Sequence, residues 1–310
     1  MASETLVTLV TPTYNQVAYL PETLDSVLAQ THPALEYLVI DDGSSDETPA
    51  VMARYADRLI AIRQDNLGQA ATLNKGWRQA RGEYIGYLSS DDLLLPEAIA
   101  RLVAVLDADP DVVCVFPNSD LIDARSRILR RAICRPFDQE STVVLQECYI
   151  GPGALFRRHA FEAVGGWRPE MRLAPDREFW IRLAALGRIE FLPESLALYR
   201  THPESTSFSA ASETVSQEYL RVLDDFYARP SVPERLLRRK SEAYANASLL
   251  LARNALWRGE FGSAVRRYRE ACRQHPPMRG LRTLWKLLRQ GASRPAKVVY
   301  TRLTRLAGLR

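Results

Sequence analysis

The chain has 310 residues, of which 46% are hydrophobic and 25% are charged, and its net charge is +4. These values are ordinary for a soluble globular protein with one large domain or two, and the length allows a substantial buried core. The four cysteines have no paired spacing, which argues against a zinc site or a disulfide framework, and the sequence shows neither a signal peptide nor the ~20-residue apolar run of a membrane span.

Short apolar segments alternate with amphipathic ones over the first hundred residues. Strands are expected at residues 6–11, 37–40, 59–62 and 84–88, where β-branched, aliphatic or aromatic side chains form short runs. Helices are expected at residues 21–30, 69–80 and 96–106, and another should end near residue 55, with Ser44 and Glu47 at the spacing of a capping box. This alternation, in units of about 30 residues, predicts a parallel, doubly wound sheet.

The pattern is less regular beyond this point. Further strands are expected at residues 112–116, 154–156 and 189–192, and a helix at 177–186. Residues 117–150 hold few strong signals, and a loop rich in Ser and Thr ends near residue 216.

The composition then changes. Residues 1–220 hold 20 Lys/Arg and 31 Asp/Glu, whereas residues 221–310 hold 21 Lys/Arg and 6 Asp/Glu. The spacings of one tetratricopeptide-like helical hairpin are matched by Ala252, Gly259, Phe261, Ala264, Tyr268, Ala271 and Pro276. We therefore expect a main domain over residues 1–216 and an Arg-rich helical region over residues 217–310, which ends in a short amphipathic run at 298–309. Its charge indicates either contact with an anionic surface or a solvated helical face.

The expected strands of the first half end on polar residues. Because the carboxyl ends of parallel strands share one edge of a sheet, these residues should converge there. Two carboxylate pairs, Asp41 with Asp42 and Asp91 with Asp92, should repel each other at this edge. A divalent cation, or a set of hydroxyl and N–H donors, would relieve the repulsion. A solvated Asp-rich loop that caps the next helix is the alternative. The sequence has no Walker loop or Gly-rich dinucleotide fingerprint, so a nucleotide held at this edge needs a bridging metal.

Three motifs in order resemble those of a family-2 glycosyltransferase with the GT-A fold. They are LVTLVTPTYN at 6–15, DDGSSD at 41–46 and RGEYIGYLSSDD at 81–92. Residues 150–157 resemble the acceptor-side turn and strand of the family, residues 174–183 its general-base helix, and residues 199–202 the segment that often closes over the diphosphate. The resemblance covers roughly residues 5–210. It implies an α/β, GT-A-like fold with a mostly parallel, doubly wound sheet flanked by helices, and a C-terminal helical appendage.

The resemblance also implies a donor site for a nucleoside-diphosphate sugar, with UDP-sugars as the commonest donors of the family. The residues expected to bind it are Pro12, Thr13, Tyr14, Asn15, Asp42, Gln69, Lys75, Asp91 and Arg200. Tyr14 would lie against the base, Asp42 would accept hydrogen bonds from it, and Asp91 would bind the ribose or the metal. Asp92, with His202, would coordinate Mg²⁺ or Mn²⁺ on the diphosphate.

Asp176 would then be the general base of an inverting transfer to a hydroxyl of a glycan or lipid-linked acceptor. The sequence departs from the family pattern at Pro175, where an acid often precedes the base, and at Ser89, where the family has an aspartate.

Alternatives remain for several residues. Asp176 would otherwise be a helix N-cap and His202 a solvated loop imidazole. Trp167 and Trp180 are expected to pack in the core. Asn74 and Lys75 are expected on the surface of their helix, near the donor.

Two rival functions belong to other classes. A non-catalytic, degenerate GT-A scaffold would dock on a membrane or a partner through the basic region. A nucleotidyltransferase would need a Gly-rich, Lys/Arg-bearing signature after the first strand, and none is present. The transferase hypothesis implies a cytoplasmic protein, with peripheral contact between the basic region and the inner face of the membrane. No nucleic-acid motif accompanies the charge.

Overall fold

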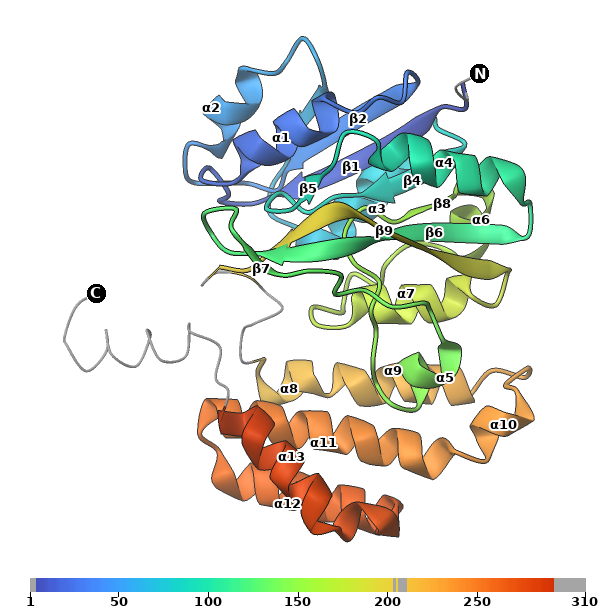
Figure 1. Ribbon diagram of the computed structural model, residues 1–310. Coiled ribbons are helices and arrows are strands. Elements are labelled where there is room, and N and C mark those ends of the chain that lie inside the picture. Colours follow the sequence, from blue (N-terminus) through green and yellow to red (C-terminus); the bar gives the residue numbers. More distant parts are fainter. Residues whose placement is uncertain (1–3, 203–204, 206–210, 293–310) are drawn as a thin grey trace, which may run out of the picture. The chain divides into compact units, whose positions relative to one another are not determined.

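The computed structural model describes residues 4–202, 205 and 211–292 (Figure 1). The expected amphipathic run at 298–309 lies outside these residues. The chain divides into two compact units. The first consists of Met1–Phe137 with Tyr149–Thr201, and the second of Asp138–Cys148 with His202–Arg310.

One mixed sheet forms the centre of the first unit. In the described residues its strands lie in the order β3-β2-β1-β4-β8-β6-β9-β5, with β7 beside β6. A parallel group comprises β1 (Val7–Thr13), β2 (Leu35–Asp41), β3 (Ile60–Arg63) and β4 (Tyr84–Tyr87). A second parallel pair comprises β6 (Val112–Ile122) and β9 (Arg188–Arg200), while β5 (Leu93–Leu94), β7 (Ile128–Arg130) and β8 (Leu155–Arg157) run antiparallel to their neighbours. The GT-A-like α/β fold class expected from the sequence is confirmed.

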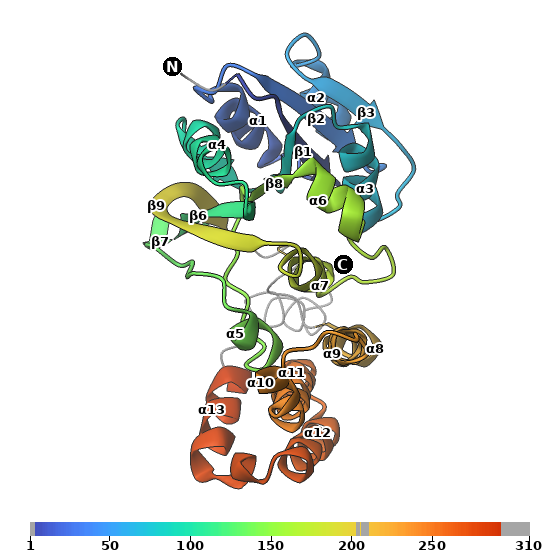
Figure 2. The ribbon, with the colours of Figure 1, turned by 90° about the vertical axis from the view of Figure 1, so that its right-hand side faces the viewer.

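Helices cover both faces of this sheet (Figure 2). One face carries α1 (Leu20–Leu28), α2 (Thr48–Ala53) and α4 (Ala98–Ala108), and the other α3 (Gln69–Gln79), α6 (Arg158–Val164) and α7 (Pro175–Leu183). The alternation along β1 separates two cores: Val7 and Leu9 pack with α1 and α4, whereas Val10 faces Gly76 of α3. A Cβ atom on Gly76 would lie 2.5 Å from Val10 Cγ1, so this glycine lets α3 approach the sheet closely.

An aromatic cluster fills the α3 side of the first unit. The indole of Trp77 lies within 6 Å, centroid to centroid, of the rings of Tyr87, Phe156, Phe161, Trp167 and Phe179. Trp180 contacts Phe156 and Phe179 in the same cluster. Trp167 and Trp180 are both buried there, which confirms the expectation that they pack in the core.

The expected strands and helices of the first hundred residues are present within two or three residues, except for the capping box. Helix α2 begins at Thr48 after Glu47, which makes no side-chain cap. Ser44 lies in the preceding loop, where its backbone N–H donates to Asp41 Oδ1 at 2.9 Å and its hydroxyl accepts from the N–H of Asn15 at 2.9 Å. These bonds hold Ser44 outside the helix, so the capping-box prediction is wrong.

Two strands run farther than the apolar pattern indicates. β6 continues from the expected 112–116 to Ile122, and β9 from the expected 189–192 to Arg200. Their pairing shifts register on both sides of Asn118. The continuation of β6 buries Asn118, Ser119 and Asp120, whose polarity conceals a strand from a search for apolar runs.

The second unit is helical in its described part. It contains α5 (Gln139–Val143), α8 (Glu213–Ser216), α9 (Glu218–Tyr227), α10 (Glu234–Leu237), α11 (Lys240–Arg258), α12 (Phe261–Gln274), the 3₁₀ helix η2 (Pro276–Arg279) and α13 (Leu281–Ala292). Helices α11 and α12 form a hairpin whose turn starts at Gly259, with a left-handed φ of 81°. None of the helices described here or in the first unit is both long and apolar enough to cross a membrane.

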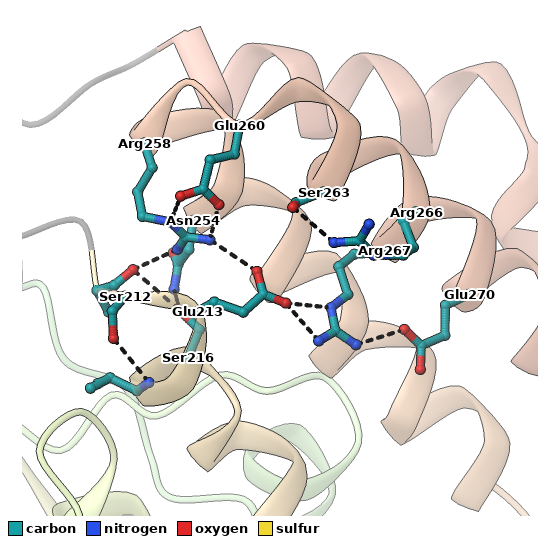
Figure 3. Close-up of polar contacts among 12 residues, drawn as sticks. Ser212, Glu213, Ser216, Asn254, Arg258, Glu260, Ser263, Arg266, Arg267 and Glu270 are labelled. Carbon is teal, nitrogen blue, oxygen red and sulfur yellow. Dashed lines mark hydrogen bonds and ion pairs between the residues drawn. The ribbon is translucent and has the colours of Figure 1, made fainter.

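Ion pairs connect three helices of this unit (Figure 3). The carboxylate of Glu213 on α8 accepts from Arg267 of α12 at 2.7 Å and from Arg258 of α11 at 3.2 Å. Glu260 and Glu270 pair with the same two arginines at 2.7 and 2.9 Å. Part of the positive charge of the Arg-rich region is therefore neutralised between its helices.

Candidate active site

The parallel group of strands brings three polar loops to one edge of the sheet. Thr13, the last residue of β1, pairs with Asp41, the last residue of β2. The N–H of Asp42 then donates to the carbonyl of Thr13 at 2.8 Å. On the other side of β1, the N–H of Leu88 just beyond β4 donates to the carbonyl of Val10 at 3.1 Å. The loops after β1, β2 and β4 therefore leave the sheet side by side.

Asn15 joins the first two loops. It has a left-handed φ of 53°, a conformation that asparagine tolerates better than most residues. Its Oδ1 accepts hydrogen bonds from the N–H groups of Ser45 at 2.8 Å and Asp46 at 3.4 Å. Its own N–H donates to Ser44, as described above. Asn15 was expected to bind the donor, and in the structure its side chain holds the two loops together.

The carboxylate of Asp42 is buried beneath the loop that follows β3. Its Oδ1 accepts from Gln64 Nε2 and from the N–H of Leu67, both at 2.8 Å, and its Oδ2 accepts from the N–H of Gly68 at 2.8 Å. Gln64 in turn accepts a hydrogen bond from Lys75 Nζ at 2.9 Å. A chain of contacts thus connects Lys75 on α3 to Asp42. Gln69, which follows this loop, is exposed.

The end of β1 presents one exposed ring and one buried hydroxyl. Tyr14 is 48% exposed, an unusual state for so large an apolar surface next to a sheet. Pro12 and Thr13 are buried, and Thr13 Oγ1 has no hydrogen-bond partner among the described residues. A buried hydroxyl without a partner is costly, so this atom is a candidate to bind a ligand.

Asp91 and Asp92 form the turn that follows β4. Asp92 is buried, and burial raises its pKa well above the ordinary value, an effect to which the neighbouring charge of Asp91 adds. Its Oδ1 accepts a hydrogen bond from the N–H of Arg200 at 2.8 Å, and its carbonyl accepts from Thr23 Oγ1 at 2.9 Å. Asp91 is only partly buried. The turn thus holds two adjacent carboxyl groups, one deep and one nearer the surface.

Arg200 lies under this turn and is buried. Its guanidinium donates to the carbonyl of Asp91 at 2.7 Å, to Ser126 Oγ at 2.9 Å and to Glu22 Oε2 at 2.7 Å. It also lies over the ring of Tyr19, 5.1 Å from the centroid. Contact between Arg200 and a diphosphate would require some of these bonds to be exchanged. His202 belongs to the second unit and is buried, and its N–H donates to Ser205 Oγ at 3.1 Å.

Asp176 is the second residue of α7. The helix has Ala174 as its N-cap and Pro175 as its first residue, so the alternative that Asp176 is the N-cap is wrong. Burial raises the pKa of Asp176, and the N–H and charge of Arg177 oppose the shift only in part. The structure therefore places at this helix start a carboxyl group that holds its proton more tightly than a solvated aspartate does.

An internal ion pair fixes the helix that carries Asp176. Glu178, 1% exposed, accepts two hydrogen bonds of 2.7 Å from Arg182 and lies 3.3 Å from Arg168 Nε. Arg182 also donates to the carbonyls of Gly165 at 3.2 Å and Gly166 at 2.6 Å. These contacts, which no sequence motif indicates, join α7 to the turn that follows α6.

Asn74 departs from its expected place on the surface of α3, because it is buried. Its Nδ2 donates to the carbonyl of Trp167 at 2.6 Å, and its Oδ1 accepts from the N–H of Trp167 at 2.8 Å. The amide forms two hydrogen bonds with one peptide segment, a structural role that its polarity did not indicate. Lys75 is partly buried and contacts Gln64 as described.

The described residues contain no cluster of three or more His, Cys, Asp or Glu side chains that would hold a metal by themselves. Asp91 and Asp92 offer two carboxyl groups. This donor set fits Mg²⁺ or Mn²⁺, because such ions are commonly bound by one or two carboxylates together with substrate phosphates and water.

Comparison with known proteins gives one consistent result. Residues 8–165 match the model of the glycosyl transferase family 2. An uncharacterised glycosyltransferase of Nostoc sp. is 33% identical over 225 residues, which is 68% of this chain and 70% of that protein. The chondroitin synthase of Escherichia coli is 26% identical over 228 residues, 72% of this chain and 33% of the synthase.

Two solved structures share the fold. TarS residues 1–349 of S. aureus, in complex with UDP-GlcNAc, superposes with a TM-score of 0.64 at 15% identity, over 88% of this chain and 92% of that one. The mannosyltransferase PcManGT of Pyrobaculum calidifontis, in complex with GDP-Man and Mn²⁺, superposes with a TM-score of 0.61 at 20% identity, over 98% of this chain and 88% of that one.

Proposed function

Because the chain belongs to glycosyl transferase family 2 and is a glycosyltransferase that uses a nucleotide-sugar donor, we propose that it is an inverting enzyme. The proposed donor is a UDP-sugar, and the proposed acceptor is a hydroxyl group of a glycan or a lipid-linked glycan. The family match favours this function over a non-catalytic scaffold and over a nucleotidyltransferase. The observation that carries the proposal is the convergence of the loops after β1, β2 and β4 at one sheet edge.

The nucleotide would bind at the ends of β1 and β2. The exposed ring of Tyr14 offers a flat apolar surface to a base, and the hydroxyl of Thr13 offers a hydrogen bond. Asp42 accepts three hydrogen bonds from described residues, two on Oδ1 and one on Oδ2, while a carboxylate has about four acceptor positions. One position remains for an N–H of the base, which suits the expected role of Asp42.

The diphosphate would bind near Asp91 and Asp92 together with Mg²⁺ or Mn²⁺. When bound, the metal would neutralise charge that develops on the leaving diphosphate. Asp92 would bind the metal through the carboxyl oxygen to which Arg200 does not donate. Asp91 would bind either the metal or the ribose through its carboxylate. The metal-binding role expected of His202 stays a proposal. The mannosyltransferase PcManGT, solved with GDP-Man and Mn²⁺, supports the use of a divalent metal in this fold.

Asp176 would act on the acceptor. Its carboxylate takes the proton of the acceptor hydroxyl as the oxygen attacks the anomeric carbon, the bond from that carbon to the phosphate oxygen breaks, and the nucleoside diphosphate leaves with the electron pair. The raised pKa suits this task, because a carboxylate that binds its proton more tightly is the stronger base. Attack from the face opposite the leaving group inverts the configuration at the anomeric carbon.

The direct test measures release of nucleoside diphosphate from UDP-, GDP- and dTDP-sugars, with Mn²⁺, with Mg²⁺ and with EDTA. We expect release from one nucleotide class, stimulated by the metal and increased by a glycan acceptor. Release that EDTA leaves unchanged would refute the metal, and the absence of release from every sugar nucleotide would refute the proposed transfer. We also propose that the protein is located at the inner face of a membrane, which it contacts through the basic C-terminal region.

A further inference from the structure

Helix α13 carries an apolar stripe that faces away from its own unit. Leu281, Trp285 and Leu288 are 84%, 63% and 53% exposed, and their spacing of four and three residues places them on one side of the helix. Scattered exposed leucines need no explanation, but three large apolar side chains in one stripe mark a surface that contacts something.

The packing of α13 fixes the direction of this stripe. The side of the helix next to the stripe buries Leu287, and a Cβ atom on Gly291 would lie 2.5 Å from Leu256 Cδ1 of α11. The indole N–H of Trp257, also on α11, donates to the carbonyl of Gln290 at 3.0 Å. Helix α13 packs against α11 and crosses it obliquely (Figures 1 and 2). Because these contacts hold the inner side, the stripe cannot turn inward within the unit.

A row of cations borders the stripe. Arg282, Lys286 and Arg289 each directly follow one of the three apolar residues, and all three are exposed. Arg289 lies over the ring of Trp285, 5.1 Å from its centroid. The paired arginines of Figure 3, Arg258 and Arg267, face carboxylates between the helices, whereas Arg282 and Lys286 form no ion pair with any described residue. The outer side of α13 is therefore both apolar and uncompensated in charge.

Charge decides which partner fits this surface. Residues 261–292 hold eight Lys/Arg and one Asp/Glu, so the partner should be anionic. A second copy related by a two-fold axis would bring the same cations face to face. Residues 293–310 hold five Lys/Arg and no Asp/Glu, so covering the stripe with this segment would also bring like charges together. Leucine and tryptophan beside Lys and Arg are the side chains of helices that lie in the interface of an anionic bilayer.

We propose that the outer side of α13 is the surface by which this protein docks on an anionic lipid bilayer. The apolar stripe enters the boundary between head groups and acyl chains, and the three cations contact lipid phosphates. The inference goes beyond the proposed transfer reaction, because docking requires neither donor nor acceptor, and it names the residues by which the enzyme would reach a lipid-linked acceptor.

The test is flotation of the full-length protein with vesicles of phosphatidylcholine, with and without phosphatidylglycerol. We expect binding only when phosphatidylglycerol is present, and weaker binding at high salt. The triple variant Arg282→Gln, Lys286→Gln, Arg289→Gln should reduce partitioning about a hundredfold. Leu281→Ser, Trp285→Ser, Leu288→Ser should reduce it by more than about tenfold. Because all six side chains are exposed, the thermal midpoints should not change.

A matched control removes the same charge from the neighbouring helix. Arg266→Gln, Arg269→Gln, Arg273→Gln alters three exposed arginines of α12 and should leave most of the binding intact. An equal loss in this control would overturn the assignment to α13, as would failure of the unaltered protein to bind anionic vesicles. Concentration-dependent dimerisation in sedimentation velocity that the apolar variant abolishes would overturn it in favour of a second copy. Nucleoside diphosphate release without vesicles should be unchanged in every variant, which separates docking from transfer.

Discussion

The backbone N–H of Arg200 donates a hydrogen bond to Asp92 Oδ1 over 2.8 Å, so the last residue of β9 holds a carboxyl group that lies 108 positions earlier in the chain. The guanidinium of the same residue donates a hydrogen bond to the carbonyl of Asp91. Arg200 therefore fixes both the main chain and one side chain of the carboxylate pair. We infer that its main contribution is to position the proposed metal ligands.

The substitution Arg200→Lys tests this positioning role. Lysine keeps the charge and the backbone N–H but loses the planar fork that reaches Glu22 and Ser126. We expect the free energy of unfolding in urea to fall by about 2–4 kcal/mol, because the lost contacts are buried. The Mn²⁺ concentration for half-maximal transfer should rise about tenfold.

Glu22→Gln is the matched control for this variant. It removes the ion pair from its exposed partner, whose side chain is 54% exposed, so the loss of stability should stay below about 1 kcal/mol. An Arg200→Lys protein with unchanged metal dependence would show that Arg200 supports the fold without positioning the carboxylates.

Asp92→Asn should separate stability from activity. In the folded chain the pKa of Asp92 is raised well above its ordinary value of 3.8, first by burial and then by Asp91. The folded state binds this proton more tightly, so its stabilising effect is complete below the unfolded pKa and disappears as the pH rises through the folded pKa. At pH values above the unfolded pKa and without metal, Asp92 therefore makes the protein less stable than a neutral side chain would.

The neutral amide introduced by Asp92→Asn would escape this penalty and still accept from Arg200. In EDTA we expect the variant to melt at a higher temperature than the unaltered protein near neutral pH, with the difference vanishing in acid. With Mn²⁺ present, transfer should fall by at least about a hundredfold. An Asp92→Asn protein that melts lower than the parent in EDTA at neutral pH would contradict the raised pKa. Calorimetric scans from about pH 4 to pH 8 measure the difference in melting temperature and its disappearance in acid, and release of nucleoside diphosphate measures transfer.

Gln64 should prove important for donor affinity, although no motif identifies it. The substitution Gln64→Met removes the bridge between Lys75 and Asp42 and leaves both charges with one partner fewer. We expect the Kd for UDP, measured by calorimetric titration, to rise about tenfold, in keeping with the loss of one or two hydrogen bonds to charged groups. Arg78→Gln is the control. Arg78 lies on the exposed side of α3, the helix that carries Lys75, and its substitution should change the Kd less than about twofold. Equal affinities for the parent and the Gln64→Met protein would remove this bridge from the donor site.

The difference between what the sequence predicted and what required coordinates has a physical origin. β1, β2 and β4 were predictable because each is a short apolar run that ends at a polar loop. Asn118 and Asp120 extend β6 through buried polar residues, which no periodicity reveals. The position of Asp91 and Asp92 just beyond β4 was predictable, because their motif is local. The contact of Gln64 with Asp42 was not, because it joins positions 22 residues apart through two loops.

The placement of residues 138–148 shows the same limit. They precede β8 in the chain but belong to the second unit, where Glu140 pairs with Arg239 and the carbonyl of Val144 accepts from Asn246 at 2.9 Å. These contacts span about a hundred positions, and a linear search for composition shifts does not detect them. The boundary expected at residue 216 rests on composition alone and stays a prediction.

Asp176→Asn tests the proposed base directly. The amide is close in shape to the carboxyl group but cannot accept the acceptor proton, so kcat should fall by about 10²–10⁴-fold while the Kd for UDP stays the same. In the unaltered enzyme, the acid limb of kcat/KM should lie at higher pH than an ordinary aspartate gives, because burial raises the pKa of Asp176. Glu170→Gln, an exposed change of the same type six residues earlier, should leave both constants unchanged. If the Asp176→Asn enzyme kept kcat within about threefold of the parent, or lost donor affinity as well, Asp176 would be a structural or donor-side residue, and the base would have to be sought elsewhere.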